Sequence, residues 1–502
     1  MARSLAGECL IAREPQAAAS HRYDLAVIGG GIHGACVALE ATRRGLRVLL
    51  VEAADFGIGA SGNSLRILHG GLRYLQSADL VRFRESVAER RWYAHTFPEL
   101  VDPLSCLMPL YGEGLKRRSV MRVALTLNDW LSRHRNDGMP ARVRLPGGGT
   151  FGVRGTQARF AAVRRVGLEG AALWHDYLMR SSERILIEIL HWACRLGARA
   201  LNYARAVGVQ SEGGQVAGLT VVDQLTGEHY DFKADRVCNC TGSLARNFAA
   251  PYGREHTELF IPSLAFNVLF DCDRLGEDAL GVAAPEAGAP VYFLCPSPHG
   301  IWAGTEHVAR PEGCVVANVT EAELLEFVGR INRAIPSIGL SLHHVRRVFS
   351  GLLPVKTAAT TSLTAREAIV NHARSGGLRG LYSVTGIKFT TARKVGERAV
   401  NEILNARRPA SLGEEIPPIS QATGFLLDGA RVATMNDVDA LRLIREVAGA
   451  ESALCAQDFC LRRTNWIFTA PDFGQLERLA ARALTPRQMP PQRAGDAAAS
   501  HV

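Results

Sequence analysis

The stretch Tyr23–Glu52 constrains the fold of this chain more than any other part of its sequence. An apolar run, Leu25–Ile28, enters a turn in which Gly29, Gly31 and Gly34 have the GxGxxG spacing. Small and apolar residues then recur at the spacing of one helix face. This order predicts a buried strand, a tight glycine turn and a helix.

A second apolar run completes the unit. Gly45 ends the expected helix, and the run Val48–Val51 follows it and is closed by Glu52. Such a βαβ unit binds a dinucleotide, because its glycines let the backbone approach a pyrophosphate and the helix N-terminus offers N–H groups and the positive end of a dipole. Glu52 is placed to accept hydrogen bonds from ribose hydroxyls, which favours FAD or NAD over NADP.

Length and composition fit a globular protein with two or three domains. The chain has 502 residues, of which 47% are hydrophobic and 21% charged. Its formal net charge of +9 fits a surplus of scattered arginines, and it also fits an anionic substrate or an anionic membrane surface. Because the arginines form no basic block with aromatic stacking residues, we expect no nucleic-acid partner. The sequence contains no uncharged apolar stretch long enough to predict a membrane-spanning helix.

The 11 cysteines show no metal-ligand spacing, so we expect no metal site. Cys238 and Cys240 form a CxC inside an apolar run and should face one side of a strand as buried thiols. The absence of a disulfide framework favours a reducing, cytoplasmic location. Residues 1–20 lack the apolar core of a secretory signal and are expected to form a flexible leader.

The strand-like and helix-like runs predict interleaved domains. Alternating runs flank a glycine pair at 213–214, and the run Cys314–Val319 is also expected to be a strand, which together indicate an antiparallel sheet. We expect an FAD-dependent oxidoreductase region over 21–420. Within it we expect cofactor-binding segments at about 21–80, 181–245 and 380–405, and a substrate domain at about 81–180 and 246–379. After it we expect a C-terminal helical domain at 421–484 and a disordered tail at 485–502.

A loop after Glu52 carries the most specific motif. It contains HGGLRY, from His69 to Tyr74, in a setting of small and polar residues that allows close approach to a flat cofactor. With the glycine turn before it, this segment resembles the FAD-dependent glycerol-3-phosphate dehydrogenases, which are related to the D-amino-acid and sarcosine oxidases. Further similar segments follow in order: CTG at 240–242, FSGLLP at 349–354, TARE at 364–367, TGIKFTTARK at 385–394 and DFCLRRT at 458–464.

The resemblance implies an α/β fold with FAD as the cofactor. A Rossmann-like FAD-binding domain of the glutathione-reductase type would be interleaved with an antiparallel-β substrate domain, and a small helical domain would follow. The cofactor-binding residues that it implies are Gly29, Gly31, Gly34, Glu52, Ser61, Ser64, His69, Gly70, Gly71, Thr241, Gly242, Gly386, Lys388 and Thr390.

The implied reaction is the oxidation of glycerol 3-phosphate to dihydroxyacetone phosphate, or of a related small anionic secondary alcohol. A hydride passes to flavin N5 while a base takes the hydroxyl proton. We expect His69 to be that base, since imidazole titrates near neutral pH. Arg73 is expected to anchor the anionic group, and Lys388 to contact either the substrate phosphate or the flavin pyrimidine edge. Arg366 is the further substrate-binding candidate.

Each of these assignments has a simpler alternative. His69 would then pack beside the isoalloxazine, Arg73 would bond loop carbonyls, and Arg366 would form a surface ion pair. Arg462 and Arg463 are expected to be structural or membrane-facing.

Three positions depart from the family pattern. Leu353 stands where the family has an arginine that helps to hold the phosphate, Gly304–His307 reads GTEH in place of GTTD, and Arg66 replaces a lysine. Arg66 remains a candidate phosphate contact together with the three cations named above. The departures leave open a flavin oxidase of an amino acid, amine or polyol that uses O₂, and a flavin-binding protein without turnover.

The expected partners are a small anionic substrate and a quinone or other electron acceptor. Family members are peripheral membrane enzymes, so a contact with the inner face of the membrane is compatible with the positive charge. A homodimer is also compatible with the sequence.

Overall fold

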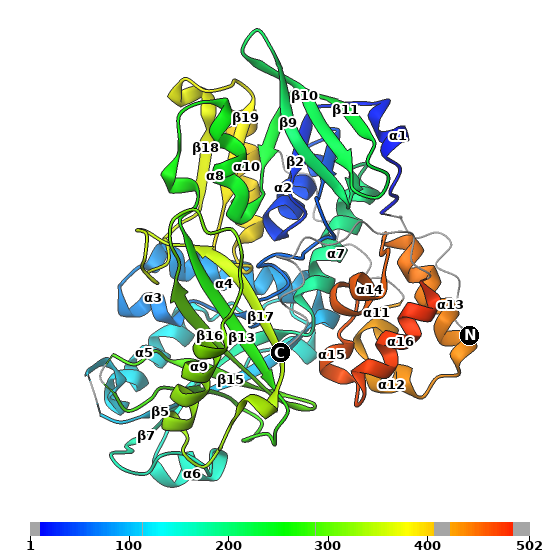
Figure 1. Ribbon diagram of the computed structural model, residues 1–502. Helices are drawn as coiled ribbons and strands as arrows, with labels where there is room; N and C mark the ends of the chain where they lie inside the picture. Colours follow the sequence, from blue (N-terminus) through cyan, green and yellow to red (C-terminus); the bar gives the residue numbers. More distant parts are fainter. Residues whose placement is uncertain (1–10, 113, 287, 406–421, 485–502) are drawn as a thin grey trace.

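The computed structural model describes residues 11–112, 114–286, 288–405 and 422–484 (Figure 1). A parallel sheet with its helices lies at the top of Figure 1, a larger sheet lies below it, and the C-terminal helices lie to one side. The expected tail at 485–502 and the first ten residues of the expected leader lie outside the described residues. Residues 11–20 differ from a loose leader, because they contain helix α1 (Pro15–Ala19), in which Ala18 is buried.

A six-stranded sheet follows from the buried apolar runs of the chain. Its order is β18-β19-β12-β2-β3-β8, in which all neighbours are parallel except the edge strand β18. Strands buried on both faces read as continuous apolar runs, as β2 and β3 do. The bounds are β2 Leu25–Ile28, β3 Val48–Val51, β8 Arg199–Leu201, β12 Val237–Asn239, β18 Ala368–Asn371 and β19 Leu381–Thr385.

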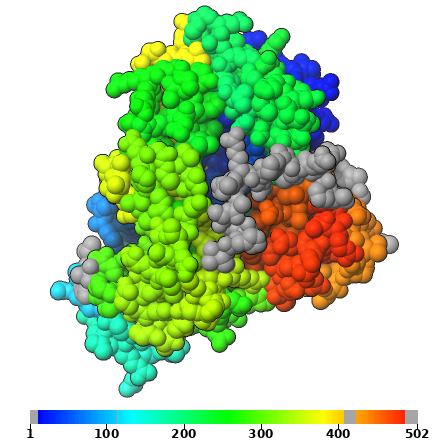
Figure 2. Space-filling model, viewed as in Figure 1, coloured from blue at the N-terminus to red at the C-terminus, as the bar shows by residue number. Residues whose placement is uncertain are grey.

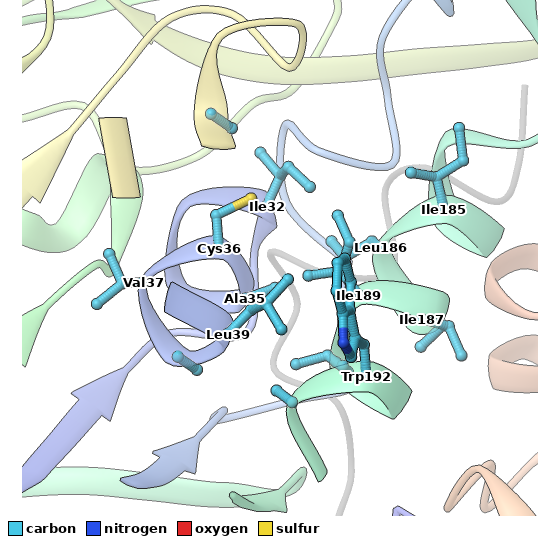
Figure 3. Packing of buried hydrophobic residues seen from close by; sticks show 14 of the residues in the cluster. Ile32, Ala35, Cys36, Val37, Leu39, Ile185, Leu186, Ile187, Ile189 and Trp192 are labelled. Carbon is cyan, nitrogen blue, oxygen red and sulfur yellow. The ribbon is translucent and has the colours of Figure 1, made fainter. Parts of the chain in front are cut away.

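Three helices cover one face of this sheet: α2 (Ile32–Arg43), α7 (Ser182–Arg195) and α10 (Ala392–Leu404). Helix α2 packs between the other two. Figure 3 shows Ala35 and Leu39 of α2 beside Ile189 and Trp192 of α7. The α2–α10 crossing is close, since a Cβ on Gly396 would lie 2.9 Å from the backbone of α2. These contacts fix the N-terminus of α2 above the sheet edge.

A second sheet covers the opposite face, so the unit has three layers. Alternate residues of β2 face in opposite directions: Leu25 and Val27 pack on the helices, while Ala26 and Ile28 pack on the second sheet. The order of that sheet is β1-β11-β10-β9. The glycine pair at 213–214 has positive φ at both residues and turns β9 into β10, as the sequence predicts. The bounds are β1 Arg22–Tyr23, β9 Ala204–Glu212, β10 Gln215–Asp223 and β11 His229–Ala234.

The nine-stranded sheet is the body of the lower unit. Its order is β17-β13-β16-β15-β14-β5-β7-β4, with β6 beside β7, and its neighbours are antiparallel except the pair β14–β5. Helix α9 (Glu321–Ala334) packs on the face that carries alternate apolar residues of β13. The bounds are β4 Ile67–Leu68, β5 Val101–Leu110, β6 Gly149–Phe151, β7 Gly170–Met179, β13 Pro262–Phe270, β14 Ala279–Val282, β15 Tyr292–Ser297, β16 Gly300–Ala309 and β17 Val345–Pro354.

Three sequence expectations differ from this arrangement. The segment Cys314–Val319 is an irregular connection and not a strand. Strand β18 lies inside the expected substrate segment but pairs with β19 of the parallel sheet, and β4 lies inside a cofactor-binding segment but pairs with β7 of the larger sheet. The CxC pair behaves as expected: both thiols are buried, and their Sγ atoms are 3.7 Å apart.

The C-terminal helices form a separate lobe, coloured orange to red in Figure 2, with its own core around Trp466. It attaches to the rest through buried ion pairs, in which Asp55 accepts hydrogen bonds from Arg462 (2.6 Å) and Arg463 (2.8 Å). Both arginines are therefore structural. The remaining helices are α3 Leu72–Gln76, α4 Leu80–Thr96, α5 Arg118–Leu131, α6 Val153–Arg159, α8 Ala245–Ala249, α11 Thr423–Leu427, α12 Gly429–Ala433, α13 Asp437–Ala450, α14 Ala456–Arg462, α15 Trp466–Thr469 and α16 Phe473–Ala483. Within the described ranges, no helix combines the length and apolarity needed to span a bilayer.

Candidate active site

The predicted cofactor residues meet at the carboxyl edge of the parallel sheet. The turn from Gly29 to Gly34 follows β2, Glu52 follows β3, Thr241 and Gly242 follow β12, and Gly386 follows β19. These strands are neighbours and run in the same direction. In open α/β sheets this edge is where nucleotide cofactors bind.

Two glycines of the turn are required by close packing. Gly29 has φ of 106°, a conformation that residues with a side chain rarely adopt. A Cβ on Gly34 would overlap the backbone oxygen of Gly29. The helix can therefore begin directly above the strand, and its N-cap residue, Gly31, has no side chain to cap the first turn. This leaves the N-terminus of α2 available to an anionic group.

The loop after β3 is tied to the same turn. Glu52 accepts hydrogen bonds from the backbone N–H groups of Gly30 (2.6 Å) and Ala54 (2.9 Å), and burial raises the pKa of its carboxyl. Ser61 Oγ accepts from the N–H of Ile32 at the start of α2 (3.0 Å). Ser64 lies further along and accepts from the N–H of Arg66 (3.2 Å). Glu52 and Ser61 thus both reach the glycine turn.

The turn after β19 meets the glycine turn through His33, which the sequence analysis did not single out. A Cβ on Gly386 would overlap the ring of His33. Burial lowers the pKa of His33 to about 4, so the ring is neutral. Its Nε2 is buried and has no hydrogen-bond partner within the described residues. A buried unsatisfied nitrogen beside a helix N-terminus fits a bound polar group.

His69 connects the site to the larger sheet, because it follows β4 and contacts residues of β7 and β15. Its side chain is 51% exposed, and its Nδ1 lies 3.1 Å from Oδ2 of Asp176 on β7. The ring of Phe293 on β15 lies 5.7 Å from the His69 ring, centroid to centroid. Asp176 was not predicted, because its residue type and its place in an apolar strand give no sign of its neighbour.

The glycines that follow His69 have structural reasons of their own. A Cβ on Gly70 would overlap the guanidinium of Arg90, and the N–H of Gly70 donates to Asp176 Oδ1 (2.7 Å). Gly71 has φ of 85° and starts α3 in the left-handed conformation. Their contact with a cofactor stays a prediction.

Lys388 comes from a different element than Arg73 and contacts helix α3, which contains Arg73, through Tyr74. Lys388, in the loop between β19 and α10, donates from Nζ to the hydroxyl of Tyr74, and Nζ lies 4.4 Å from the centroid of the Tyr74 ring. Arg73 and Lys388 are both exposed. The loop thus brings the amine close to the turn that carries His69.

His307 on β16 is a second residue that the sequence analysis left without a role. Burial and then the charge of Arg73 lower the pKa of its imidazole, which is therefore neutral at pH 7. Its Nδ1 is buried without a hydrogen-bond partner in the part of the chain that the structure describes. The only sequence signal was the departure of GTEH from the family pattern.

One face of the nine-stranded sheet lies against the loop after β3. On β13, Nδ2 of Asn267 donates to the backbone oxygen of Asn63 (2.9 Å). On β17, a Cβ on Gly351 would lie 2.9 Å from Ala60. Leu353, two residues further, is on the same face and half-buried. The position at which the family has an arginine therefore lies on the sheet face that contacts the loop after β3.

One predicted phosphate contact, Arg66, does not join this site, and another, Arg366, stays a prediction. Arg66 is buried, donates to both carboxylate oxygens of Glu183 (2.8 and 2.9 Å) and to Asn465 (2.7 Å), and its guanidinium lies over the rings of Trp302 and Phe468. It was wrong to count Arg66 as a phosphate contact, since its charge is already neutralised. Arg366 is exposed, and no hydrogen bond or ion pair joins it to another described residue.

The arrangement can hold a dinucleotide and act on a small anion. The glycine turn, the N-terminus of α2 with its glycine N-cap, the Glu52 carboxylate and the unpartnered His33 nitrogen fit FAD. The half-exposed imidazole of His69 and the exposed side chains of Arg73 and Lys388 complete the arrangement. Thr390, also predicted at the cofactor, is buried at the start of α10. No cluster of three metal-binding side chains occurs in the described ranges.

Comparisons with known proteins agree with this geometry. A family model described as FAD dependent oxidoreductase matches residues 24–401. A glycerol-3-phosphate dehydrogenase of Synechocystis sp. is 30% identical over 407 residues, which cover 77% of this chain and 70% of that protein.

Among solved structures, the glycerol-3-phosphate dehydrogenase from Bacillus halodurans complexed with FAD has a TM-score of 0.68 at 20% identity, covering 94% of this chain and 91% of that one. Glycine oxidase from Bacillus cereus ATCC 14579 has a TM-score of 0.55 at 16% identity, covering 77% and 96%. These two structures share the fold of the chain.

Proposed function

This chain belongs to the FAD-dependent oxidoreductase family, and we propose that it oxidises glycerol 3-phosphate, or a closely related small anionic secondary alcohol. The observation that carries the proposal is that Lys388, which follows the turn at the carboxyl edge of the FAD-type sheet, contacts Tyr74 in the same segment as His69 and Arg73. The Synechocystis relative, named a glycerol-3-phosphate dehydrogenase, supports the substrate. Bound FAD supplies the hydride acceptor.

His69 is the proposed base. Because its Nδ1 faces the Asp176 carboxylate, its Nε2 is free to take the proton of the substrate hydroxyl. Half of the side chain is exposed, so a substrate can reach it.

Arg73 and Lys388 are the proposed anchors for the anionic group. A guanidinium binds a phosphate or carboxylate through paired N–H groups, whereas an ammonium acts as a point charge. Lys388 is held by Tyr74, which keeps the amine near the turn between His69 and α3. Arg366 is exposed and remains a proposed outer contact only.

A second candidate is an oxidase of an amino acid, amine or polyol. Leu353 and the neutral His307 favour it, because both make the sheet face less charged than an arginine and an aspartate would. Such an enzyme would need fewer phosphate contacts than the leading candidate does.

Anaerobic reduction of the bound flavin separates the candidates. The purified protein should show an oxidised-flavin spectrum that bleaches when glycerol 3-phosphate is added. Glycerol at the same concentration is the control for the phosphate. Bleaching by an amino acid, amine or polyol but not by glycerol 3-phosphate would establish the second candidate, and a flavin that no donor bleaches would leave a binding protein without turnover.

The proposed electron acceptor is a quinone, reached at a membrane surface. Helix α5 exposes an apolar stripe, of which Val123 (68% exposed) and Trp130 (61%) protrude most. The basic side chains Arg117 and Arg122 flank the stripe and are exposed. An apolar helix face with basic neighbours fits the surface of an anionic bilayer. A second copy of the chain is the other occupant that this face admits.

A further inference from the structure

Behind His69 lies a buried carboxylate, Asp176, which the proposed function uses only as the group that Nδ1 faces. We propose that Asp176 is the positioning residue for His69: it holds the proton on Nδ1, so that Nε2 is the atom that accepts the hydroxyl proton. The inference rests on the proposed function, since it assigns a base to that reaction.

The four hydrogen bonds of Asp176 determine which nitrogen of His69 is protonated. Its Oδ1 accepts from the N–H of Gly70 (2.7 Å) and from Arg90 Nη1 (2.6 Å). Its Oδ2 accepts from Trp174 Nε1 (3.2 Å) and lies 3.1 Å from His69 Nδ1. An ionised carboxylate only accepts hydrogen bonds, so the remaining contact requires a proton on Nδ1.

Asp176 stays ionised despite its burial. Its side chain is only 4% exposed, which by itself opposes the charged form. The hydrogen bond from His69 and the charge of Arg90 outweigh burial and hold the pKa of Asp176 well below its usual range. The carboxylate is therefore a fixed negative charge at the pH where the enzyme would work.

Arg90 holds the carboxylate in place. The guanidinium is 6% exposed, and its Nη1 also donates to the backbone oxygen of His175 (3.0 Å). It fits against the backbone because position 70 is a glycine, where a Cβ would overlap the guanidinium. The chain His69–Asp176–Arg90 thus joins the catalytic turn to β7 and α4, two rigid elements of the larger unit. A base oriented by such a support keeps its tautomer and direction.

The proton balance of the reaction assigns each group a task. The substrate C–H bond breaks with its electron pair, which bound FAD would accept as a hydride, while the O–H bond breaks and its proton moves to His69 Nε2, so that a C=O bond forms. His69 becomes an imidazolium. The negative charge of Asp176 beside Nδ1 stabilises that cation.

The variant Asp176→Asn tests the assignment with almost no change of shape. The amide oxygen can still accept from Arg90 and Gly70, but the amide N–H donates to Nδ1 and forces the proton onto Nε2. We expect anaerobic flavin reduction by glycerol 3-phosphate to slow by roughly 10²–10⁴-fold while FAD stays bound.

Asp278→Asn is the matched control. Asp278 is also a buried carboxylate, but it pairs with Arg159 and Ser105 and contacts none of the site residues. Its reduction rate should stay near that of the wild type. An equal loss in both variants would mean that a buried carboxylate matters only for packing, and would overturn the assignment.

A direct readout of the tautomer is independent of any substrate. In ¹⁵N-histidine-labelled protein, with His69→Ala to identify the resonances, the wild type should carry the His69 proton on Nδ1, and Asp176→Asn should move it to Nε2. A wild-type ring protonated on Nε2 would refute the proposal even if the variant failed to fold. If the wild-type flavin is not reduced by glycerol 3-phosphate, the proposed function fails while this measurement still reports on Asp176.

Discussion

Lys388 lies over the ring of Tyr74, with its Nζ 4.4 Å from the ring centroid and hydrogen-bonded to the phenol hydroxyl. The two residues come from distant parts of the chain. Their contact closes the loop after β19 onto helix α3, beside Arg73. Among the described residues, no carboxylate forms an ion pair with this amine, which is one of the two proposed anchors for the substrate anion.

The variant Lys388→Met should weaken the handling of an anionic substrate. A hydrogen bond from a charged donor contributes about 1.5–3 kcal/mol, so we expect kcat/KM for glycerol 3-phosphate to fall by roughly 10–100-fold. Steady-state kinetics with an artificial electron acceptor measure it. Lys394→Met is the control, because Lys394 pairs with Glu397 on α10. Equal effects of the two variants would count against a substrate contact.

The variant Leu353→Arg should favour phosphorylated substrates. The new guanidinium would lie on the sheet face that contacts the cofactor loop, where the chain now has a half-buried leucine. One charge-assisted contact should lower KM for glycerol 3-phosphate by about tenfold. Leu353→Met keeps the size without the charge and should leave KM unchanged. An unaltered KM in Leu353→Arg would show that the substrate phosphate binds elsewhere.

Stability should decline in acid through Glu451, which joins the C-terminal lobe to α7. Burial opposes its ionisation, but Arg184 and the hydrogen bond from His191 lower the pKa of Glu451 to about 2. Between about pH 4.5 and 2 the unfolded state therefore binds more protons than the folded state, and stability falls as pH falls through this window. Thermal unfolding across this range measures the loss.

The variant Glu451→Gln isolates that contribution. It leaves the buried Arg184 with an incomplete set of partners, so we expect a loss of about 3–5 kcal/mol at pH 7 and a weaker dependence on acid pH. Asp437→Asn, which breaks the exposed pair with Arg482, should change little. An undiminished acid dependence in Glu451→Gln would assign the effect to other carboxylates.

Vesicle flotation tests the surface of α5. The wild type should float with vesicles of anionic lipid and not with neutral ones, and the double variant Val123→Glu, Trp130→Glu should stay unbound while keeping its FAD. Val166→Glu is the control, since Val166 is 79% exposed and lies outside this helix. If the wild type does not bind the vesicles, and the double variant is a monomer where the wild type is a dimer, the stripe is a dimer interface.

The cofactor edge was predictable because its signals are local. The run Leu25–Ile28, the spaced glycines and the run Val48–Val51 lie within one short stretch, and strand neighbours in a βαβ unit follow from chain order. Gly386 and Gly242 were placed by the resemblance, and the parallel pairing of β12 and β19 brings them together.

The support behind His69 was not predictable from one sequence. Asp176 reaches His69 only because β4 pairs with β7, and nothing local to either strand specifies that pairing. Arg66 was misassigned for a similar reason: the C-terminal lobe supplies Asn465, and α7 supplies Glu183, which together neutralise it. From the sequence alone, an arginine in a polar loop that is open to a substrate cannot be told from one that pairs with residues of distant elements.

The strand predicted at Cys314–Val319 does not form, because this segment is part of the connection between β16 and α9. The segment leads into α9 over the edge of the larger sheet, where the backbone oxygen of Ala317 accepts a hydrogen bond from Ser350 (2.6 Å). Val319 and Ala317 pack on the core of that unit without pairing in the sheet. Two other residues of the run, Val315 and Val316, are exposed, so its apolar composition predicted neither a strand nor burial along the whole segment.

The central claim is that a hydride from a secondary alcohol of an anionic substrate reduces the flavin. Stopped-flow reduction with glycerol 3-phosphate deuterated at C2 measures it most directly. We expect anaerobic bleaching of the flavin, formation of the keto product, and slower reduction with the deuterated substrate than with the unlabelled one. A flavin that stays oxidised, or that is reduced at the same rate by both substrates while a C1-deuterated one is slower, would contradict it.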